Sequence, residues 1–282
     1  MIKIKKNSKV KTRSSQLTAR SSQLLILIAL LLFGCEKVID VDLNEASPEI
    51  VIEANLSDYT NNAELKLTKT GSYFGETPIE KITDATVLIE NEFGETFNLD
   101  EIEDGFYRTE DVVFKSGVTY NLSVSVETEK YESSSKLNQV VLIDSLKYYF
   151  DEGFVFLDAG YIVKIYFNDP PDENNYYRIK VFENDTLRNN TEDLFVFDDR
   201  LIDGQSLEVN MRGVIFDLGD TVSIQLVSLD EGAYEYLKTF QELINVNAGS
   251  AAPANPTSNI TNGALGYFSA WSADEKTVII EE

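Results

Sequence analysis

The chain has 282 residues, with 24 basic against 48 acidic side chains and no histidine. The excess of negative charge repels phosphate backbones and argues against nucleic-acid partners, while 43% hydrophobic residues can supply a folded core and argue against general disorder. Without histidine the chain has no Ser-His-Asp triad, no Cys-His pair and no histidine-ligated zinc site.

The first 34 residues are predicted to be a secretory leader. They contain seven basic and no acidic side chains, and they end in an unbroken apolar run over Leu24–Phe33. This run is shorter than the roughly 20 residues that a membrane-spanning helix needs, and it has the length of a signal-peptide core. A buried helix start or a membrane anchor is the alternative. Removal of this basic leader would leave a formal charge near −31 on the mature chain.

The leader ends in a motif that indicates its type. Leu32-Phe33-Gly34-Cys35 resembles the bacterial lipobox, although Phe33 is larger than the usual residue at its place. The resemblance implies that the Cys35 thiol receives a diacylglyceryl group, that the chain is cut before Cys35, and that the new amine is acylated. Cys35 is the only cysteine, so it cannot form an intramolecular disulfide, and lipidation accounts for it. Several acyl chains, at about 0.8 kcal/mol per buried methylene, would anchor the protein firmly.

Residues 35–48 are acidic and lack periodicity, so we interpret them as a tether. Acidic residues directly behind a lipidated cysteine resemble the export signals that send some lipoproteins to the outer face of the outer membrane. A plain linker is the alternative. We therefore expect an outer-membrane lipoprotein attached through its lipid, with the cell surface slightly favoured over the periplasmic side.

Residues 49–140 are predicted to form a β-sandwich of about seven short strands. Apolar and polar residues alternate along them, which is the period of half-buried strands, and turn residues separate them. Asp84–Val87, Asp104–Tyr107 and Gly117–Tyr120 resemble transthyretin-like and carboxypeptidase-regulatory-like sandwiches. The first predicted strand begins at Ile50, and the others cover residues 63–70, 85–90, 96–99, 106–108, 119–127 and 131–135.

Residues 141–282 are predicted to form a β-rich α+β domain with one amphipathic helix, so that the whole chain is mainly β with an Ig-like or transthyretin-like sandwich first. The helix is expected over Asp230–Asn245, where apolar residues recur at helical spacing, and Ser228–Glu231 fits a capping box at its start. We expect this helix to pack on one face of the second sheet. Residues 249–262 indicate a long loop. The predicted strands are 145–150, 161–168, 176–183, 194–197, 207–211, 221–229, 265–272 and 277–280.

A glycine and aromatic cluster near the C-terminus is the candidate contact site. Gly263 and Gly266 indicate positive φ or a close backbone approach. Tyr267, Phe268 and Trp271 then supply aromatic surface. Core packing is one interpretation of these side chains, and a ligand platform or a receptor contact is the other, because aromatic residues anchor interfaces.

Calcium is the only ion whose binding we consider from the sequence, since oxygen ligands are plentiful. Asp100–Gly105 and Asp199–Gly204 imitate the start of an EF-hand loop, but both place an apolar residue at the third ligand position and neither has glutamate at the twelfth. We interpret them as Asp-Gly turns. The run Asp169–Asn175 could supply oxygens in another geometry. We otherwise predict no metal site and no cofactor.

The whole mature chain resembles a lipoprotein family of diderm bacteria, the domain-of-unknown-function family numbered 4249. Its members tend to occur beside TonB-dependent outer-membrane receptors, so the resemblance implies an accessory part in nutrient uptake and no known catalytic residues. The matching segments are the lipobox at Cys35, Val51–Ala54, Asp84–Ile89, Asp104–Tyr107, Gly117–Leu122 and, most specifically, Ser258–Phe268.

Three functions remain open at this stage. The first is a non-enzymatic outer-membrane lipoprotein that assists a TonB-dependent receptor, and the second is a free-standing carbohydrate- or peptide-binding module. The third is a hydrolase that uses paired carboxylates, which needs only Asp and Glu, although 48 acidic residues single out no pair. We expect the first and expect no enzymatic activity.

Overall fold

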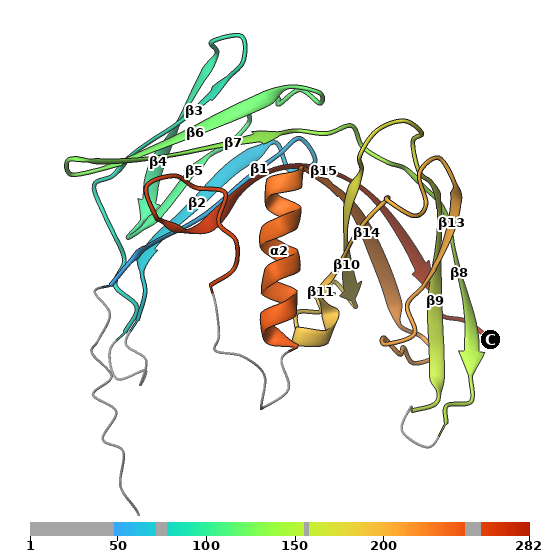
Figure 1. Cartoon of the computed structure of the whole chain (residues 1–282). Helices are drawn as coiled ribbons and strands as arrows, with labels where there is room; N and C mark the ends of the chain where they lie inside the picture. Colours follow the sequence, from blue (N-terminus) through green and yellow to red (C-terminus); the bar gives the residue numbers. More distant parts are fainter. Residues whose placement is uncertain (1–47, 72–77, 155–157, 246–254) are drawn as a thin grey trace, which may run out of the picture. The chain divides into compact units, whose positions relative to one another are not determined.

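The computed structural model describes residues 48–71, 78–154, 158–245 and 255–282 (Figure 1). The chain divides into two compact units, residues 1–45 and 46–282, and every described residue belongs to the second. The predicted leader and Cys35, with the tether as far as residue 47, therefore lie outside the described residues. Among the described residues, no helix is long and apolar enough to cross a membrane.

The described chain is mainly β, as predicted, and contains a single α-helix. The strands lie close to the ranges predicted from apolar alternation. They are β1 Ile50–Ser57, β2 Asn62–Lys69, β3 Thr86–Asn91, β4 Thr96–Glu103, β5 Phe106–Thr109, β6 Thr119–Val126, β7 Glu129–Lys136, β8 Ile143–Asp151, β9 Gly160–Asn168, β10 Tyr176–Glu183, β11 Thr186–Leu187, β12 Phe195–Asp198, β13 Ser206–Asn210, β14 Thr221–Leu229 and β15 Leu265–Ile279; the helix is α2 Glu231–Ile244, and a 3₁₀ turn, η1, covers Thr191–Asp193.

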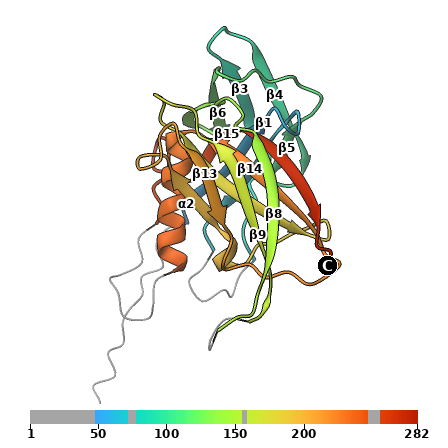
Figure 2. The ribbon, with the colours of Figure 1, turned by 90° about the vertical axis from the view of Figure 1, so that its right-hand side faces the viewer.

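Twelve of these strands form one continuous sheet in the order β11-β10-β14-β15-β1-β2-β5-β4-β3-β6-β7, with β12 paired to β10. The other three form a small sheet in the order β13-β9-β8. Buried residues of this small sheet, such as Ile165, pack with Ile179 of β10 and Ile224 of β14 in one hydrophobic core. The second half of the chain is thus a two-layer arrangement, with β8, β9 and β13 in front of β14 in the view of Figure 2.

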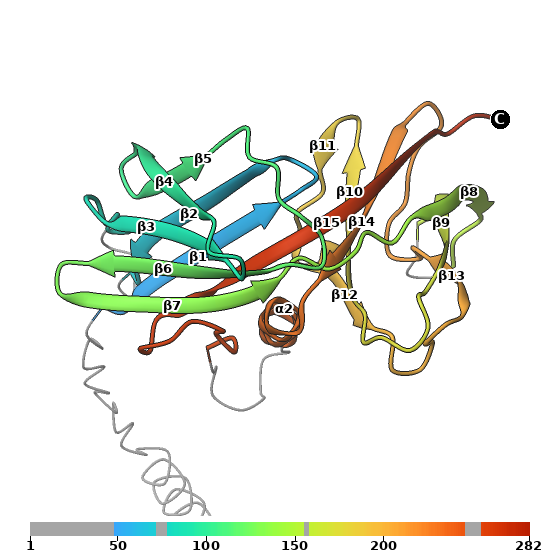
Figure 3. The same cartoon turned by 90° about the horizontal axis from the view of Figure 1, so that it is seen from above.

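β15 joins the two halves of the large sheet (Figure 3). Its first half pairs in parallel with β1, from Val51↔Leu265 to Ser57↔Trp271. Its second half pairs antiparallel with β14, as far as Ile279. The two strands predicted at 265–272 and 277–280 are therefore one strand, because residues 273–276 between them also find partners on β14. The predicted domain boundary between residues 140 and 141 stays a prediction. β15 comes after this boundary in the sequence but pairs with a strand from each side of it, β1 and β14.

The C-terminal segment also completes the core of the first half. Ile260, Ala264, Phe268 and Ala270 are buried in one cluster with residues between 52 and 137. The loop before β15 lies along β7, where Thr261 N donates to the Glu132 carbonyl at 2.8 Å. Burial of these late residues contributes to the stability of a core whose other members come much earlier in the chain.

The helix α2 packs on the face of β14 and β15 that is opposite the small sheet. Ala233, Tyr234 and Leu237 are its buried residues. The helix has the predicted range, but its N-cap is Asp230, whose side chain accepts from Ala233 N at 3.2 Å. The predicted capping box at Ser228 is wrong, because β14 continues to Leu229 and keeps Ser228 in the ladder.

Candidate ligand-binding site

Two neighbouring hollows, which share lining residues, lie between α2 and the large sheet, and we call them together the helix pocket. The outer pocket has a volume of about 370 Å³ and lies against the α2 side chains Tyr236 and Phe240. The inner recess is much smaller, about 20 Å³, and is lined by Lys180 and Trp271 among others. Arg178 lines both hollows, as do Leu237 and Tyr267.

Strand alternation explains why charged residues line this pocket. Tyr177, Ile179 and Val181 of β10 are buried in the core shared with the small sheet. Because successive side chains of a strand point to opposite faces, Arg178 and Lys180 point to the helix side. Two cations therefore lie next to each other on one face of β10, under the cover of α2.

Neither cation has a carboxylate partner in the described ranges of the chain. Among the described residues, the ion pairs include neither Arg178 nor Lys180. The Lys180 ammonium instead lies 4.1 Å from the centre of the Trp271 ring, a cation–π contact. Burial, followed by the charge of Arg178, lowers the pKa of Lys180 to about 8. Burial also lowers the pKa of Arg178.

The charges at the mouth of the pocket are, by contrast, paired. Arg188 donates to Glu183 at 2.7 Å and to Asp193 at 3.3 Å. Glu53 lies 3.6 Å from Lys66 of the neighbouring strand β2. The acidic groups that line the mouth, Glu53 and Asp193, thus already form ion pairs. They do not neutralise the positive charge of the inner recess.

Polar groups without a strong partner complete the recess. Ser269 is 2% exposed, and its Oγ has no hydrogen-bond partner within the part of the chain that the structure describes. The Asn55 amide donates to the Tyr267 hydroxyl at a long 3.3 Å. The Tyr267 ring stacks on Tyr236 with 4.7 Å between centroids. Each of the three strands β1, β10 and β15 can therefore offer an N–H or O–H donor to a ligand.

The aromatic residues singled out in the sequence separate onto two faces of β15. Tyr267 and Trp271 line the helix pocket. Phe268 points the other way and is fully buried in the first core, which fits the core-packing interpretation of this residue. Sequence reasoning missed Arg178 and Lys180. Their signal was the alternation of a predicted strand whose polar face carries two cations, but the helix that covers this face could not be seen in it.

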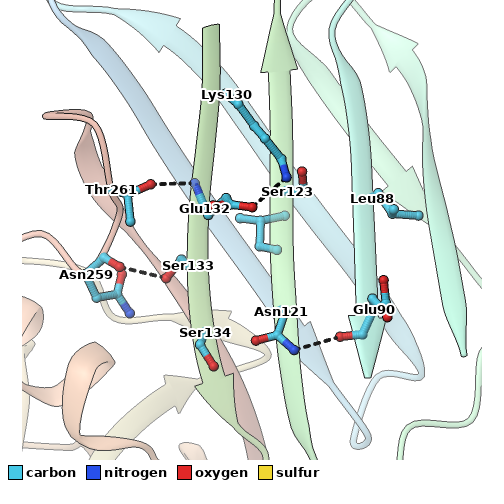
Figure 4. A pocket seen from close by; sticks show the side chains of 11 residues that line it. Leu88, Glu90, Asn121, Ser123, Lys130, Glu132, Ser133, Ser134, Asn259 and Thr261 are labelled. Atoms are coloured by element: carbon cyan, nitrogen blue, oxygen red, sulfur yellow. Dashed lines mark hydrogen bonds and ion pairs between the residues drawn. The ribbon is translucent and has the colours of Figure 1, made fainter. Parts of the chain in front are cut away.

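A separate hollow, of about 500 Å³, lies on the face of β3, β6 and β7 beside the loop at Asn259 and Thr261 (Figure 4). Lys130 is the only basic residue that lines it. Its ammonium forms an ion pair with Glu132 at 2.5 Å, and both side chains are more than half exposed. The one basic group of this hollow is therefore already paired and exposed, and we place the candidate site in the helix pocket.

Three aspartates lie close enough together to hold a cation. Oxygens of Asp169, Asp199 and Asp203 are all within 4.8 Å of one another, so the structure brings together two segments that the sequence presented separately. Each carboxylate already accepts from a loop backbone: Asp169 from Gly204 N at 2.9 Å, Asp199 from Asn175 N at 2.8 Å, and Asp203 likewise. These contacts make them acceptors that fix two loops.

The other EF-hand-like segment is a turn, as interpreted. Asp104 and Gly105 connect β4 and β5. Gly105 has a φ of +67°, which favours glycine, and its N–H donates to Glu101 Oε1 at 2.9 Å.

Comparison with known proteins gives a family without an activity. The family described as "Domain of unknown function (DUF4249)" matches residues 36–277. Among solved structures, a two-domain fibronectin type-III segment from chicken tenascin is similar at 11% identity, over 64% of this chain and 90% of that chain, with a TM-score of 0.21. The fold assignment rests on the strand pairing and not on that score. No curated protein matches the chain.

Proposed function

The chain belongs to the DUF4249 family, and on that premise we propose that it is a non-enzymatic, lipid-anchored binding protein of the outer membrane. In this proposal it assists a TonB-dependent receptor by holding a ligand before uptake. Cys35 carries the lipid, and the described part of the chain presents the binding site outside the cytoplasm. The transthyretin-like sandwich predicted for residues 49–140 belongs to the same proposal.

The helix pocket is the observation that carries the binding role. Arg178 and Lys180 present unpaired charge, and Tyr267 and Trp271 supply apolar walls. Ligand sites are typically concave, largely aromatic or apolar, and equipped with a few convergent polar groups. The carboxylates at the mouth, such as Asp193, are held in ion pairs, so the pocket offers no paired acids for hydrolysis.

Anchoring is tested by replacing the lipidated residue. We expect Cys35→Ala to move the protein from the membrane fraction to the soluble fraction, because the acyl chains have no other attachment point. Trp271→Ala, which keeps Cys35, is the matched control and should stay with the membranes. A Cys35→Ala protein that still fractionates with membranes contradicts the anchoring part of the proposal.

The receptor partnership is tested by purification of the tagged full chain from its native host in mild detergent. A TonB-dependent receptor should co-purify with it. If none does, and a soluble glycan or peptide alone quenches the fluorescence of Trp271, the protein is instead a free-standing binding module. That alternative is favoured by one observation, the position of Trp271 in the pocket.

A further inference from the structure

We propose that the helix pocket binds an oxyanion, a carboxylate or phosphate group of its ligand, between Arg178 and Lys180. This inference names the ligand chemistry of the binding site proposed above and rests on that proposed function. It follows from three observations: two unpaired cations, a set of convergent donors and the sizes of the two hollows.

The unpaired cations are the first observation. Charges removed from water are normally paired, because desolvation of an isolated ion costs several kcal/mol. Arg178 and Lys180 are partly buried, have no carboxylate partner among the described residues, and repel each other because they lie two residues apart on one face of β10. The chain has 48 acidic residues, yet no acidic residue lines the inner recess. A bound anion would supply the missing negative charge to both cations at once.

The convergent donors are the second observation. A guanidinium presents a planar fork of N–H groups that matches carboxylate and phosphate oxygens, and an ammonium adds a compact charge. Ser269 Oγ is buried at the recess without a partner among the described residues. A serine hydroxyl donates readily to an anionic oxygen. Arg178, Lys180 and Ser269 thus come from β10 and β15 to one point.

The sizes of the hollows are the third observation. The inner recess is small, about 20 Å³, which is of the order of a site for a few water-sized atoms. It therefore admits an oxygen of the anion and not a ring. The outer pocket of about 370 Å³ accommodates the remainder of a small organic molecule beside Tyr236 and Phe240. The ligand class is accordingly a small organic acid or phosphate ester.

Trp271 provides a built-in probe for the test, because it is the only tryptophan of the chain and Lys180 lies 4.1 Å from its ring. The full chain in detergent is titrated separately with sodium phosphate and sodium acetate, and with sodium chloride at equal ionic strength as the reference. We expect a saturable change in tryptophan emission with at least one oxyanion, beyond the chloride response. A response to phosphate alone identifies a phosphate ester, and a response to acetate alone identifies a carboxylic acid. If neither phosphate nor acetate gives a saturable response, the inference is overturned.

Charge-removing variants locate the site. Arg178→Met and Lys180→Met should each weaken oxyanion binding by about tenfold to hundredfold, the effect of losing a charged hydrogen-bond donor. Lys180→Arg keeps the charge and should retain binding, which keeps the test decisive if Arg178→Met does not fold. Lys130→Met removes an exposed, paired lysine from the hollow on β7 and should bind as the unmodified chain does. Equal binding by Lys180→Met and Lys130→Met contradicts the inference.

The two proposals fail separately. A negative oxyanion titration leaves the results for Cys35→Ala and for the receptor co-purification intact. A failed anchoring test, in turn, leaves a saturable oxyanion response in place.

Discussion

Lys180 occupies a position that lowers the stability of the fold at neutral pH. The titratable groups that line the recess with it are Arg178 on the same strand and Tyr267 on β15, and neither is an anion at neutral pH. Its partner on β14 is Gln225, which donates to Glu275 at 3.2 Å. The pKa of Lys180 is lowered to about 8 in the folded state, against about 10.4 for a solvated lysine. The folded protein therefore binds fewer protons than the unfolded chain between these two values.

Lys180→Met should consequently stabilise the protein at pH 7, by roughly 1–3 kcal/mol, since one pKa unit corresponds to about 1.4 kcal/mol. The stability of the unmodified chain rises between pH 8 and about 10.4 as the lysine loses its proton, so the difference between the two proteins should shrink over that window. Urea unfolding of both proteins at pH 7 and pH 10, without added anions, measures it. A loss of stability in Lys180→Met at pH 7 would contradict an uncompensated charge at this site.

Gly266 is required by the close approach of two strands. It has a φ of +95°, and a β-carbon there would lie 2.0 Å from the carbonyl oxygen of Ile52. Gly266→Ala should therefore lower the free energy of unfolding by roughly 3–5 kcal/mol, from backbone strain and steric overlap together. Gly263 is the matched control, because it has a φ of +74° with open space around it; its alanine variant should lose only about 1–2 kcal/mol. Equal losses in thermal or urea unfolding would show that the close approach does not matter.

Single residues of the site were predicted in part from the sequence. The glycine pair indicated positive φ or a close approach, and both are present at Gly266. Tyr267 and Trp271 were singled out with Phe268, but only the register of β15 decides which of the three point to the pocket. Arg178 could not be recognised, because an unpaired charge is a property of its surroundings and not of its own strand.

Among the elements, the helix start is the place where local sequence rules failed. Two overlapping signals, Ser228 and Asp230, could each begin α2. The ladder between β10, β14 and β15 extends through Ser228, so tertiary pairing selected Asp230 as the cap. Burial raises the pKa of Asp230 to about 6, in spite of the hydrogen bond from Ala233 N.

The protonated form of Asp230 is accordingly favoured by folding. Its contribution to stability is full below pH 3.8 and is lost as the pH rises through about 6. Asp230→Asn keeps a good cap without a charge. Its free energy of unfolding, relative to that of the unmodified chain, should therefore be roughly 1–3 kcal/mol higher at pH 7 than at pH 4. Asp230→Ala, which removes the cap, should lose roughly 1 kcal/mol against the asparagine variant at both pH values. Denaturant unfolding at pH 4 and pH 7 measures these differences, and a pH-independent gap between aspartate and asparagine would contradict the assignment.

Strands were predicted more successfully than their connections. Alternation located nearly every strand because each has one buried face, as the strand β6 from Thr119 to Val126 shows. The division of β15 into two strands was the exception, since Asp274, Glu275 and Lys276 interrupt the apolar pattern. Their places in the ladder are set by β14, which supplies hydrogen-bond partners whatever the side chains are.

For the whole molecule, the strand order could not be obtained from the sequence. β1 pairs with β15, whose residues lie more than 200 positions later, and no local pattern encodes such a partner. The same pairing brings Phe268 into the first core and Tyr267 over the second half of the sheet. The helix pocket therefore exists only because the last strand of the chain lies between its two halves.

The central claim is that this acidic chain works as a lipid-anchored binding protein outside the cytoplasm. Intact mass spectrometry of the protein extracted from its native host tests it most directly. The account predicts a chain that begins at Cys35 and carries the mass of a diacylglyceryl group and an amide-linked acyl chain. A chain that retains residues 1–34, or an unmodified Cys35, would contradict it.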